Sequence, residues 1–306
     1  MNIKNPLTIM NMIKKYFLSN FLFISSHPLY YTLHMKTAGK MEEEMLKHKR
    51  LFVSDMDGTF YLGEHLLPGS LDFARAIYRH NSRLVFLTNN SSRTPEEYIR
   101  KLVKMGIERR LFEVYTSGEA TVSLLKNCFP GKKVYLLSTH SVRKMFLDKG
   151  IVLDESNPDV LVLTYDTEIT YEKIRKAALF IRRGVPYIAS HPDINCPTEE
   201  GPVPDVGSLI SLFETSTGRK PDQIVGKPDP TILNMVMKDF GCSPEETVMV
   251  GDRLYTDIEC GLRAGVDTYL VLSGETTEDM IPVTHSYRVV QNTGSLAAMI
   301  DKDNTV

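Results

Sequence analysis

From Leu51 onward, short runs of aliphatic and β-branched residues alternate with amphipathic helical stretches. The runs with the length of strands are Leu51–Met56, Arg83–Asn89, Val114–Ser117, Val134–Ser138, Val160–Tyr165, Pro186–Ser190, Gln223–Val225, Thr247–Gly251 and Thr268–Leu272. Strands that alternate with helices predict parallel sheets whose two faces are both covered by helices. The pattern therefore predicts an α/β fold with a doubly wound parallel sheet.

One helical stretch shows the pattern clearly. In Tyr171–Gly184, the apolar residues Ile174, Ala177 and Ile181 recur at the spacing that places them on one face of a helix. Gly184 stands at the position where a glycine commonly ends a helix.

Composition limits the class of protein. The 306 residues are 42% hydrophobic and 24% charged, and the formal net charge is −2. This balance is typical of a globular protein and gives no broad attraction to nucleic acid. The cysteines form no CxxC pair, which favours reduced thiols in a cytoplasmic protein over a disulfide framework. They are Cys128, Cys196, Cys242 and Cys260.

The first forty residues differ from the rest. Lys14 and Lys15 precede the apolar run Tyr16–Ile24, which is far shorter than the ~20 residues that span a bilayer. It also lacks a clear signal cleavage site. We expect no stable membrane insertion and treat residues 1–40 as a poorly ordered extension. A membrane-surface anchor, or a true start at Met35 or Met41, stays open.

The first polar cluster, LFVSDMDGTFYLG, places two acids directly after an apolar strand. Asp55 and Asp57 are one residue apart, so one carboxylate can attack phosphorus while the other handles the proton of the leaving group. Gly58 lets the backbone turn sharply beside a substrate. A surface turn is the structural alternative, and a calcium loop would need further oxygen ligands ending in Glu. We interpret the pair as catalytic.

The second cluster, LVFLTNNSSRTPEEY, follows a strand that ends at Thr88. Thr88, Asn89 and Asn90 offer donors beside a helix start, where phosphate oxygens can be held. Ser, Thr and Asn also cap helices routinely, and the isolated segment is better explained by capping.

The third cluster, IVGKPDPTIL, contains Lys227 between a glycine and a proline. A fixed ammonium group there can offset the charge of an attacked phosphoryl group. Taken alone, Lys227 is better explained as an exposed loop residue.

The fourth cluster, TVMVGDRLYTDIECGLRAG, delivers Asp252 at a strand end and Asp257 inside the following helix. Mg²⁺ usually takes one or two protein carboxylates and completes its shell with water and substrate phosphate. Helix capping explains Asp252 equally well when that residue is considered alone.

In this order, the four clusters resemble the haloacid dehalogenase-like hydrolase superfamily. The resemblance extends over about residues 50–300 and is strongest to class IIA, which includes NagD-type nucleotide phosphatases and 4-nitrophenylphosphatases. It rests on the segments DMDGTFYLG, TNNSSRTPEEY, TSGEAT, GKPDP and MVGDRLYTD. It implies a Rossmann-like core with an inserted α/β cap domain of the C2 type, and a phosphatase that acts on a small phosphorylated metabolite.

The resemblance also implies roles for the acids. Asp55 would be the nucleophile, and Asp57 the general acid and base. Mg²⁺ would be held by Asp55 and Asp252 together with the backbone carbonyl of Asp57. Asp257 would support these groups without binding the metal directly.

Phosphate binding follows from the same resemblance. Thr88 and the backbone around Asn89 and Asn90 would bind the phosphoryl group. Lys227 would stabilise both the nucleophile and the transferring group.

The spacing of the polar clusters along the chain predicts where the cap is inserted. The interval from Asp57 to Thr88 is too short for a domain, whereas the interval from Thr88 to Lys227 leaves room for one. The expected division is a core of residues 41–130 and 223–306 and a cap of residues 131–222. A cap can close over the substrate and limit water.

The segment SHPDINCPTEEG is the predicted selectivity loop of the cap. Its candidate residues are His191, Asp193, Asn195 and Cys196; a rigid surface turn is the structural alternative. In pyridoxal phosphatase relatives a histidine of this loop contacts the substrate. Cys196 stands near that position, which puts recognition of pyridoxal phosphate in doubt.

Two other functions compete with a phosphatase. A phosphotransferase or phosphomutase would use the same intermediate, but mutase relatives usually carry the cap between the first two clusters. A non-catalytic phospholigand-binding protein on this fold would be expected to have lost the acids or the lysine. The sequence leaves the substrate and the oligomeric state open, although caps in this family often pair into homo-oligomers.

Overall fold

A computed structural model describes residues 45–198 and 200–301. The fold presented here is that of the unit that starts at Leu46. The expected extension, residues 1–40, lies outside the described residues.

Within the described residues, six parallel strands form the larger sheet, in the order β15-β14-β13-β1-β4-β5. The strands are β1 Leu51–Ser54, β4 Arg83–Thr88, β5 Glu113–Thr116, β13 Thr247–Gly251, β14 Asp267–Val271 and β15 Arg288–Val290. The first strand, β1, lies between β4 and β13, so the strand order reverses beside it. Ligands of open α/β sheets bind at such a point, outside the carboxyl ends of the strands.

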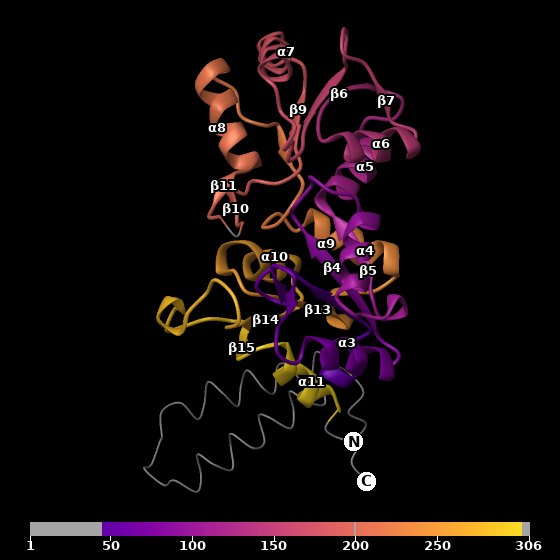
Figure 1. The fold of residues 1–306 in the computed structure, drawn as a ribbon, viewed down its shortest axis with the longest axis vertical. Coiled ribbons are helices and arrows are strands. Elements are labelled where there is room, and N and C mark those ends of the chain that lie inside the picture. Colours follow the sequence, from indigo (N-terminus) through magenta and orange to yellow (C-terminus); the bar gives the residue numbers. More distant parts are fainter. Residues whose placement is uncertain (1–44, 199, 302–306) are drawn as a thin grey trace, which may run out of the picture. The chain divides into compact units, whose positions relative to one another are not determined.

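Helices cover both faces of this sheet (Figure 1). Phe52 and Val53 of β1 point to opposite faces because successive strand residues alternate. The Phe52 face is covered by α3 Ser70–Arg79, α4 Pro95–Lys104 and α11 Thr293–Asp301. The Val53 face is covered by α5 Ser117–Cys128, α9 Thr231–Phe240 and α10 Glu259–Ala264. The sheet is therefore doubly wound.

A second parallel sheet has the order β12-β9-β8-β6-β7. Its strands are β6 Lys133–Leu137, β7 Val152–Leu153, β8 Val160–Leu163, β9 Tyr187–Ala189 and β12 Gln223–Ile224. Its helices are α7 Tyr171–Arg182 and α8 Val206–Thr217, which pack on one face, and α6 His140–Asp148, which packs on the other. One apolar cluster contains both Val53 of the first sheet and Val162 of the second, and residues of α5 belong to it.

Several of the shortest elements are not anticipated by the sequence, although β12 is. Two antiparallel pairs consist of two residues per strand: β2 Tyr61–Leu62 with β3 His65–Leu66, and β10 Asn195–Cys196 with β11 Val203–Pro204. Single helical turns are found at Arg109–Leu111, Pro244–Glu246, Glu278–Met280 and, in π-helical form, Leu254–Ile258.

The structure confirms the α/β fold class with a doubly wound core sheet and a second α/β layer. It also confirms the helix that starts at Tyr171, which ends before Gly184 with that glycine at φ 84°. β12 pairs with β9 and so extends the second sheet past residue 222, where the sequence placed the end of the cap. The division into core and cap stays a prediction.

Candidate active site

The reversal point of the larger sheet collects three of the predicted polar residues. Asp55 follows β1, Thr88 ends β4 and Asp252 follows β13. The backbone amide of Asp55 still pairs with Val250 of β13 at 2.9 Å, so the sheet itself fixes this acid. Lys227 reaches the same place from the loop that leaves β12 of the second sheet.

Lys227 is the centre of the cluster. Its ammonium nitrogen lies 2.5 Å from Oδ1 of Asp55 and 2.6 Å from Oδ1 of Asp257, and it donates to the carbonyl of Leu87 at 3.0 Å. Its side chain is 3% exposed, so these three contacts use all the donors of a buried cation. Burial alone would lower the pKa of Lys227, but the charges of Asp257 and Asp55 outweigh burial and raise it.

Two carboxylates contact this cation, and a third lies close to those two. Asp55, Asp252 and Asp257 each offer one oxygen, and these oxygens all lie within 4.8 Å of one another. Burial raises the pKa of Asp55 to about 8 although Lys227 lowers it, and the charges of Asp257 and Asp252 raise it further. Burial and the charge of Asp257 likewise raise the pKa of Asp252 to about 6. One ammonium group therefore faces a cluster of three acids, and the mutual charge of these acids raises the pKa values of Asp55 and Asp252.

The donor set fits a hard divalent cation. Carboxylate oxygens are the ligands that Mg²⁺ prefers, and the surplus negative charge at Asp55 and Asp252 is what such a cation would neutralise. Asp57 was predicted to bind the same cation through its backbone carbonyl. Its side-chain carboxylate is not one of the three clustered carboxylates, whereas that of Asp257 is.

Close packing holds Asp252 in place. Oδ1 of Asp252 accepts a hydrogen bond from Thr59 at 3.0 Å, and Oδ2 accepts one from the amide of Glu275 at 2.8 Å. Gly58, at φ 84°, comes so close that a Cβ atom there would lie 2.5 Å from Oδ2. The sharp backbone turn expected at Gly58 is confirmed, and Asp252 is the group that the glycine accommodates.

The side chain of Asp57 contacts Tyr61. The Tyr61 hydroxyl donates to Oδ2 of Asp57 at 3.1 Å. Burial raises the pKa of Asp57, whereas Lys101 and the Tyr61 hydrogen bond lower it. A carboxyl group that holds its proton above the usual range suits a general acid.

The loop after β4 is held by its own side chains. The amide of Asn90 donates to Oγ1 of Thr88 at 3.1 Å, and the amide of Ser92 donates to Oδ1 of Asn90 at 3.0 Å. The carbonyl of Asn89 accepts a hydrogen bond from Ser117. Thr94, further on, caps α4 in a reciprocal pair with Glu97, as the capping interpretation expects.

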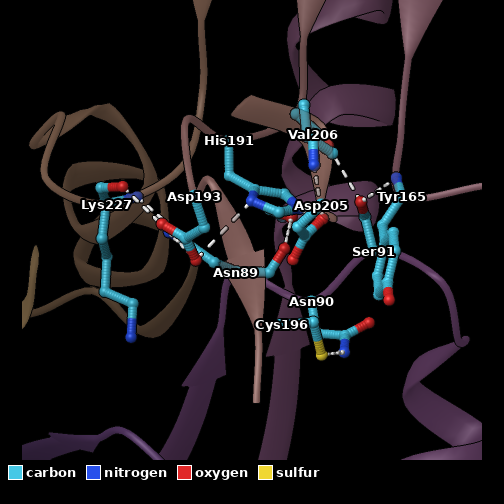
Figure 2. Close-up of polar contacts among 12 residues, drawn as sticks. Asn89, Asn90, Ser91, Tyr165, His191, Asp193, Cys196, Asp205, Val206 and Lys227 are labelled. Carbon is cyan, nitrogen blue, oxygen red and sulfur yellow. Dashed lines mark hydrogen bonds and ion pairs between the residues drawn. The ribbon is translucent and has the colours of Figure 1, made fainter. Parts of the chain in front are cut away.

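The Asn89 side chain faces away from the strand end and joins two other segments (Figure 2). Its Oδ1 accepts from the amide of Lys227 at 2.9 Å, and its Nδ2 donates to the carbonyl of Lys227 at 2.9 Å. Nδ2 also lies 3.1 and 3.2 Å from the two carboxylate oxygens of Asp193. The side chain of Asn89 is therefore occupied by contacts with other segments of the protein.

The predicted selectivity loop reaches the larger sheet at two of its four candidates. Asp193 contacts Asn89, and Sγ of Cys196 lies 3.7 Å from Nδ2 of Asn90. Asn195 is exposed. The side chain of His191 is fully buried. Its Nδ1 lies 3.6 Å from a carboxylate oxygen of Asp193, and its Nε2 lies 3.6 Å from one of Asp205.

Neither ring nitrogen of His191 has a hydrogen-bond partner among the described residues. Burial lowers the pKa of His191 to about 4, although Asp193 raises it. Burial raises the pKa of Asp205 to about 7 against the lowering effect of its hydrogen bond from the amide of Val206. Asp205 is the N-cap of α8 and was not anticipated, although an acid before a helical run is a capping signal.

A separate cavity of about 360 Å³ lies at the amino ends of β4 and β5, lined by Arg83, Glu113 and neighbouring residues. It contains none of the predicted site residues, so the acid cluster remains the candidate site. Among the described residues, no helix has both the length and the apolar character needed to cross a bilayer.

Two family models match the chain. One, described as haloacid dehalogenase-like hydrolase, matches residues 52–152, and the other, described as HAD-hydrolase-like, matches residues 224–295. Among solved structures, a 4-nitrophenylphosphatase from Thermotoga maritima is 47% identical with a TM-score of 0.80, covering 83% of this chain and 98% of that one.

Two curated relatives are also named for the release of phosphate from small molecules. An acid sugar phosphatase of Staphylococcus haemolyticus is 35% identical over 233 residues, which are 76% of this chain and 88% of the relative. A 5′-nucleotidase of Bacillus subtilis is 36% identical over 246 residues, which are 79% of this chain and 96% of the relative.

Fold, site and relatives together define an α/β phosphoric monoester hydrolase. The chain belongs to the haloacid dehalogenase-like hydrolase family, in the branch of the NagD and 4-nitrophenylphosphatase proteins.

Proposed function

We propose that this phosphatase hydrolyses a small phosphomonoester through a phosphoaspartate on Asp55, with Mg²⁺ as cofactor. The observation that carries the proposal is the 2.5 Å contact between Lys227 and Asp55 inside a cluster of three acids. An anionic carboxylate must approach an anionic phosphoryl group, and fixed positive charge lowers the barrier to that approach.

In the first step, an oxygen of Asp55 bonds to phosphorus as the bond from phosphorus to the leaving oxygen breaks. Asp57 gives its proton to that leaving oxygen, and the raised pKa of this buried acid supports the role. The hydroxyl of Thr88 and the backbone around Asn89 and Asn90 hold the phosphoryl oxygens.

In the second step, water attacks phosphorus and the bond from phosphorus to Asp55 breaks. Asp57, now a carboxylate, takes the proton of the water. Lys227 stabilises the carboxylate of Asp55 as it leaves, because its ammonium group is already bound there.

Mg²⁺ would be held by Asp55, Asp252 and the backbone carbonyl of Asp57, and it would supply the positive charge that Lys227 alone does not provide. Asp257 orients Lys227, as its 2.6 Å contact supports.

We further propose that residues 131–222 form a cap whose loop at 191–196 contributes to substrate selection. The contacts of Asp193 and Cys196 with the loop after β4 support this placement. Sugar phosphates and nucleoside 5′-monophosphates are the first substrate classes to assay, because relatives are named for activity on them.

The test is a screen for released phosphate with Mg²⁺ over these classes and 4-nitrophenyl phosphate. Chelation and Asp55→Asn should each abolish release, while Asp239→Asn, at an exposed acid of α9, should not. Acid-quenched Asp57→Asn should carry a phosphoryl group on the peptide that contains Asp55. Release that survives Asp55→Asn unchanged would refute the nucleophile, and transfer to an added alcohol instead of water would identify a phosphotransferase.

A further inference from the structure

The carboxamide of Asn89 is fully used by two segments that are distant in the sequence. Its oxygen and one of its N–H groups pair with the amide and carbonyl of Lys227, both at 2.9 Å. Nδ2 also donates to the carboxylate of Asp193. A primary carboxamide has two N–H donors, so none is left for a substrate.

These contacts fix the main chain of Lys227 and not its ammonium group. The ammonium group lies at the other end of the side chain, bound to Asp55 and Asp257. Asn89 thus fixes the main chain of Lys227, and the two acids fix the ammonium group at the end of its side chain.

Tight packing leaves this junction little freedom to shift. A Cβ atom at Gly226 would lie 2.6 Å from Oδ1 of Asn89 and 2.7 Å from Cβ of His191. On the far side, the carbonyl of Asp193 accepts from the amide of Gly207 at 2.7 Å. Asp193 is therefore held to α8 through its main-chain carbonyl and to Asn89 through its carboxylate. Figure 2 shows the contact with Asn89.

We propose that Asp193 is a positioning residue, which acts through the side chain of Asn89 on the backbone of Lys227. The inference rests on the role proposed above for Lys227. It makes the loop at 191–196 part of the support of the catalytic ammonium group, in addition to any contact with the substrate.

The physical argument is geometric. Hydrogen bonds weaken steeply when their distance or angle departs from the optimum, and the 2.5 Å and 2.6 Å contacts of Lys227 leave little tolerance. Loss of the Asp193 carboxylate leaves an N–H of Asn89 unpaired and removes a charge-assisted hydrogen bond. The Asn89 carboxamide that holds the Lys227 backbone then loses its own support from the loop at 191–196.

A direct contact of Asp193 with the substrate is the competing explanation, and two substitutions separate them. Asp193→Asn keeps an oxygen that accepts from Asn89, whereas Asp193→Ala removes it. We expect Asp193→Ala to lower kcat about tenfold. The factor should be the same for a sugar phosphate, a nucleoside 5′-monophosphate and 4-nitrophenyl phosphate. Asp193→Asn should keep most of the kcat. Losses that fall on KM and differ among substrates, or equal damage from both variants, would overturn the proposal.

A double-mutant cycle gives the second readout. Asn89→Ala and Asp193→Ala break the same connection, so the double variant should be no slower than Asn89→Ala alone. Independent, multiplying losses would contradict the inference. The matched control is Asp159→Ala, because Asp159 accepts from the amide of Lys133 in the second sheet without contact to Asn89.

Thermal unfolding of each variant separates poor folding from poor catalysis, and Asp193→Ser replaces Asp193→Ala if the latter does not fold. Full kcat in Asp193→Ala, with activity still abolished by Asp55→Asn, removes this inference and leaves the proposed function intact. Activity that survives Asp55→Asn removes the proposed function itself.

Discussion

The hydroxyl of Tyr61 donates a hydrogen bond to Oδ2 of Asp57 across 3.1 Å. The Tyr61 ring is fully buried, and the ammonium nitrogen of Lys101 lies 4.1 Å from its centroid. Burial and this cation hold the ring in place, so the hydroxyl gives the Asp57 carboxyl a fixed orientation. Under the proposed function, the other oxygen of Asp57 would carry the proton for the leaving group.

Tyr61→Phe should therefore slow substrates whose leaving group needs a proton. We expect kcat to fall about tenfold for an alkyl phosphate and only slightly for 4-nitrophenyl phosphate, whose leaving group departs readily as an anion. Tyr135→Phe is the matched control, because its hydroxyl donates to the carbonyl of Lys173 in α7 at 3.1 Å and not to a residue of the acid cluster. Equal losses for the two substrates would show that Tyr61 does not act through the general acid.

Lys227→Met should lower stability as well as activity. Without the ammonium group, the buried Asp55 and Asp257 lose their cationic partner, and removal of one partner from such a cluster costs about 3–5 kcal/mol. We expect the free energy of unfolding, measured with denaturant in the presence of a chelator, to fall by about this amount. Lys149→Met is the control, since its pair with Glu119 is partly exposed and should contribute about 1 kcal/mol at most. A Lys227→Met protein as stable as the parent would argue that the three acids are not charged together.

The sequence predicted the strands well because both sheets are parallel and covered on both faces. Strands such as β1 and β4 are then continuous apolar runs that end in polar residues, and that pattern is visible without a structure. Asp55, Thr88 and Asp252 meet because the carboxyl ends of neighbouring parallel strands meet. Elements of two residues, such as β2 and β10, carry no periodicity and were missed.

The part of the site that sequence could not provide depends on packing between distant segments. The bond from Asn89 to Asp193 joins residues separated by 104 positions, and no local pattern records it. Asp257 was expected beside the site and inside a helix, but its contact with Lys227 from the π-helical turn Leu254–Ile258 is a geometry that the sequence does not specify.

Gly274→Ala should weaken the response to Mg²⁺ more than it weakens the fold. A Cβ atom at this position would lie 2.0 Å from Oδ2 of Asp252, so the carboxylate must move. Under the proposed function, the Mg²⁺ concentration for half-maximal activity should rise at least about tenfold, because a ligand displaced by even 1 Å is poorly placed. Gly118→Ala is the control, since its Cβ would meet neighbours at an ordinary 3.6 Å. An unchanged Mg²⁺ requirement in Gly274→Ala would speak against Asp252 as a ligand.

His191 should make the folded protein sensitive to mild acid. Its pKa is lowered from 6.5 to about 4, so between these values the unfolded chain binds a proton that the folded protein does not. The contribution of His191 to stability is thus complete above pH 6.5 and falls as the pH drops toward 4. Asp205, whose pKa is raised to about 7, has the opposite effect, since its folded form keeps a proton that the unfolded chain loses above about pH 4.

Comparison of His191→Gln with the parent isolates the contribution of the histidine to the pH dependence of stability. The charged groups that face it remain in place in both proteins: Asp193, Asp205 and Lys227. Between pH 7.5 and 5, His191→Gln should lose about 2 kcal/mol less unfolding free energy than the parent, as 1.5 pH units below 6.5 imply. Denaturant titrations at the two pH values measure this difference, with His140→Gln, at an exposed position, as the control. If His191→Gln and the parent lose the same free energy over this interval, the pKa of His191 is not lowered by burial in the folded protein; a smaller loss in the parent would mean that the carboxylates of Asp193 and Asp205 hold the histidine protonated.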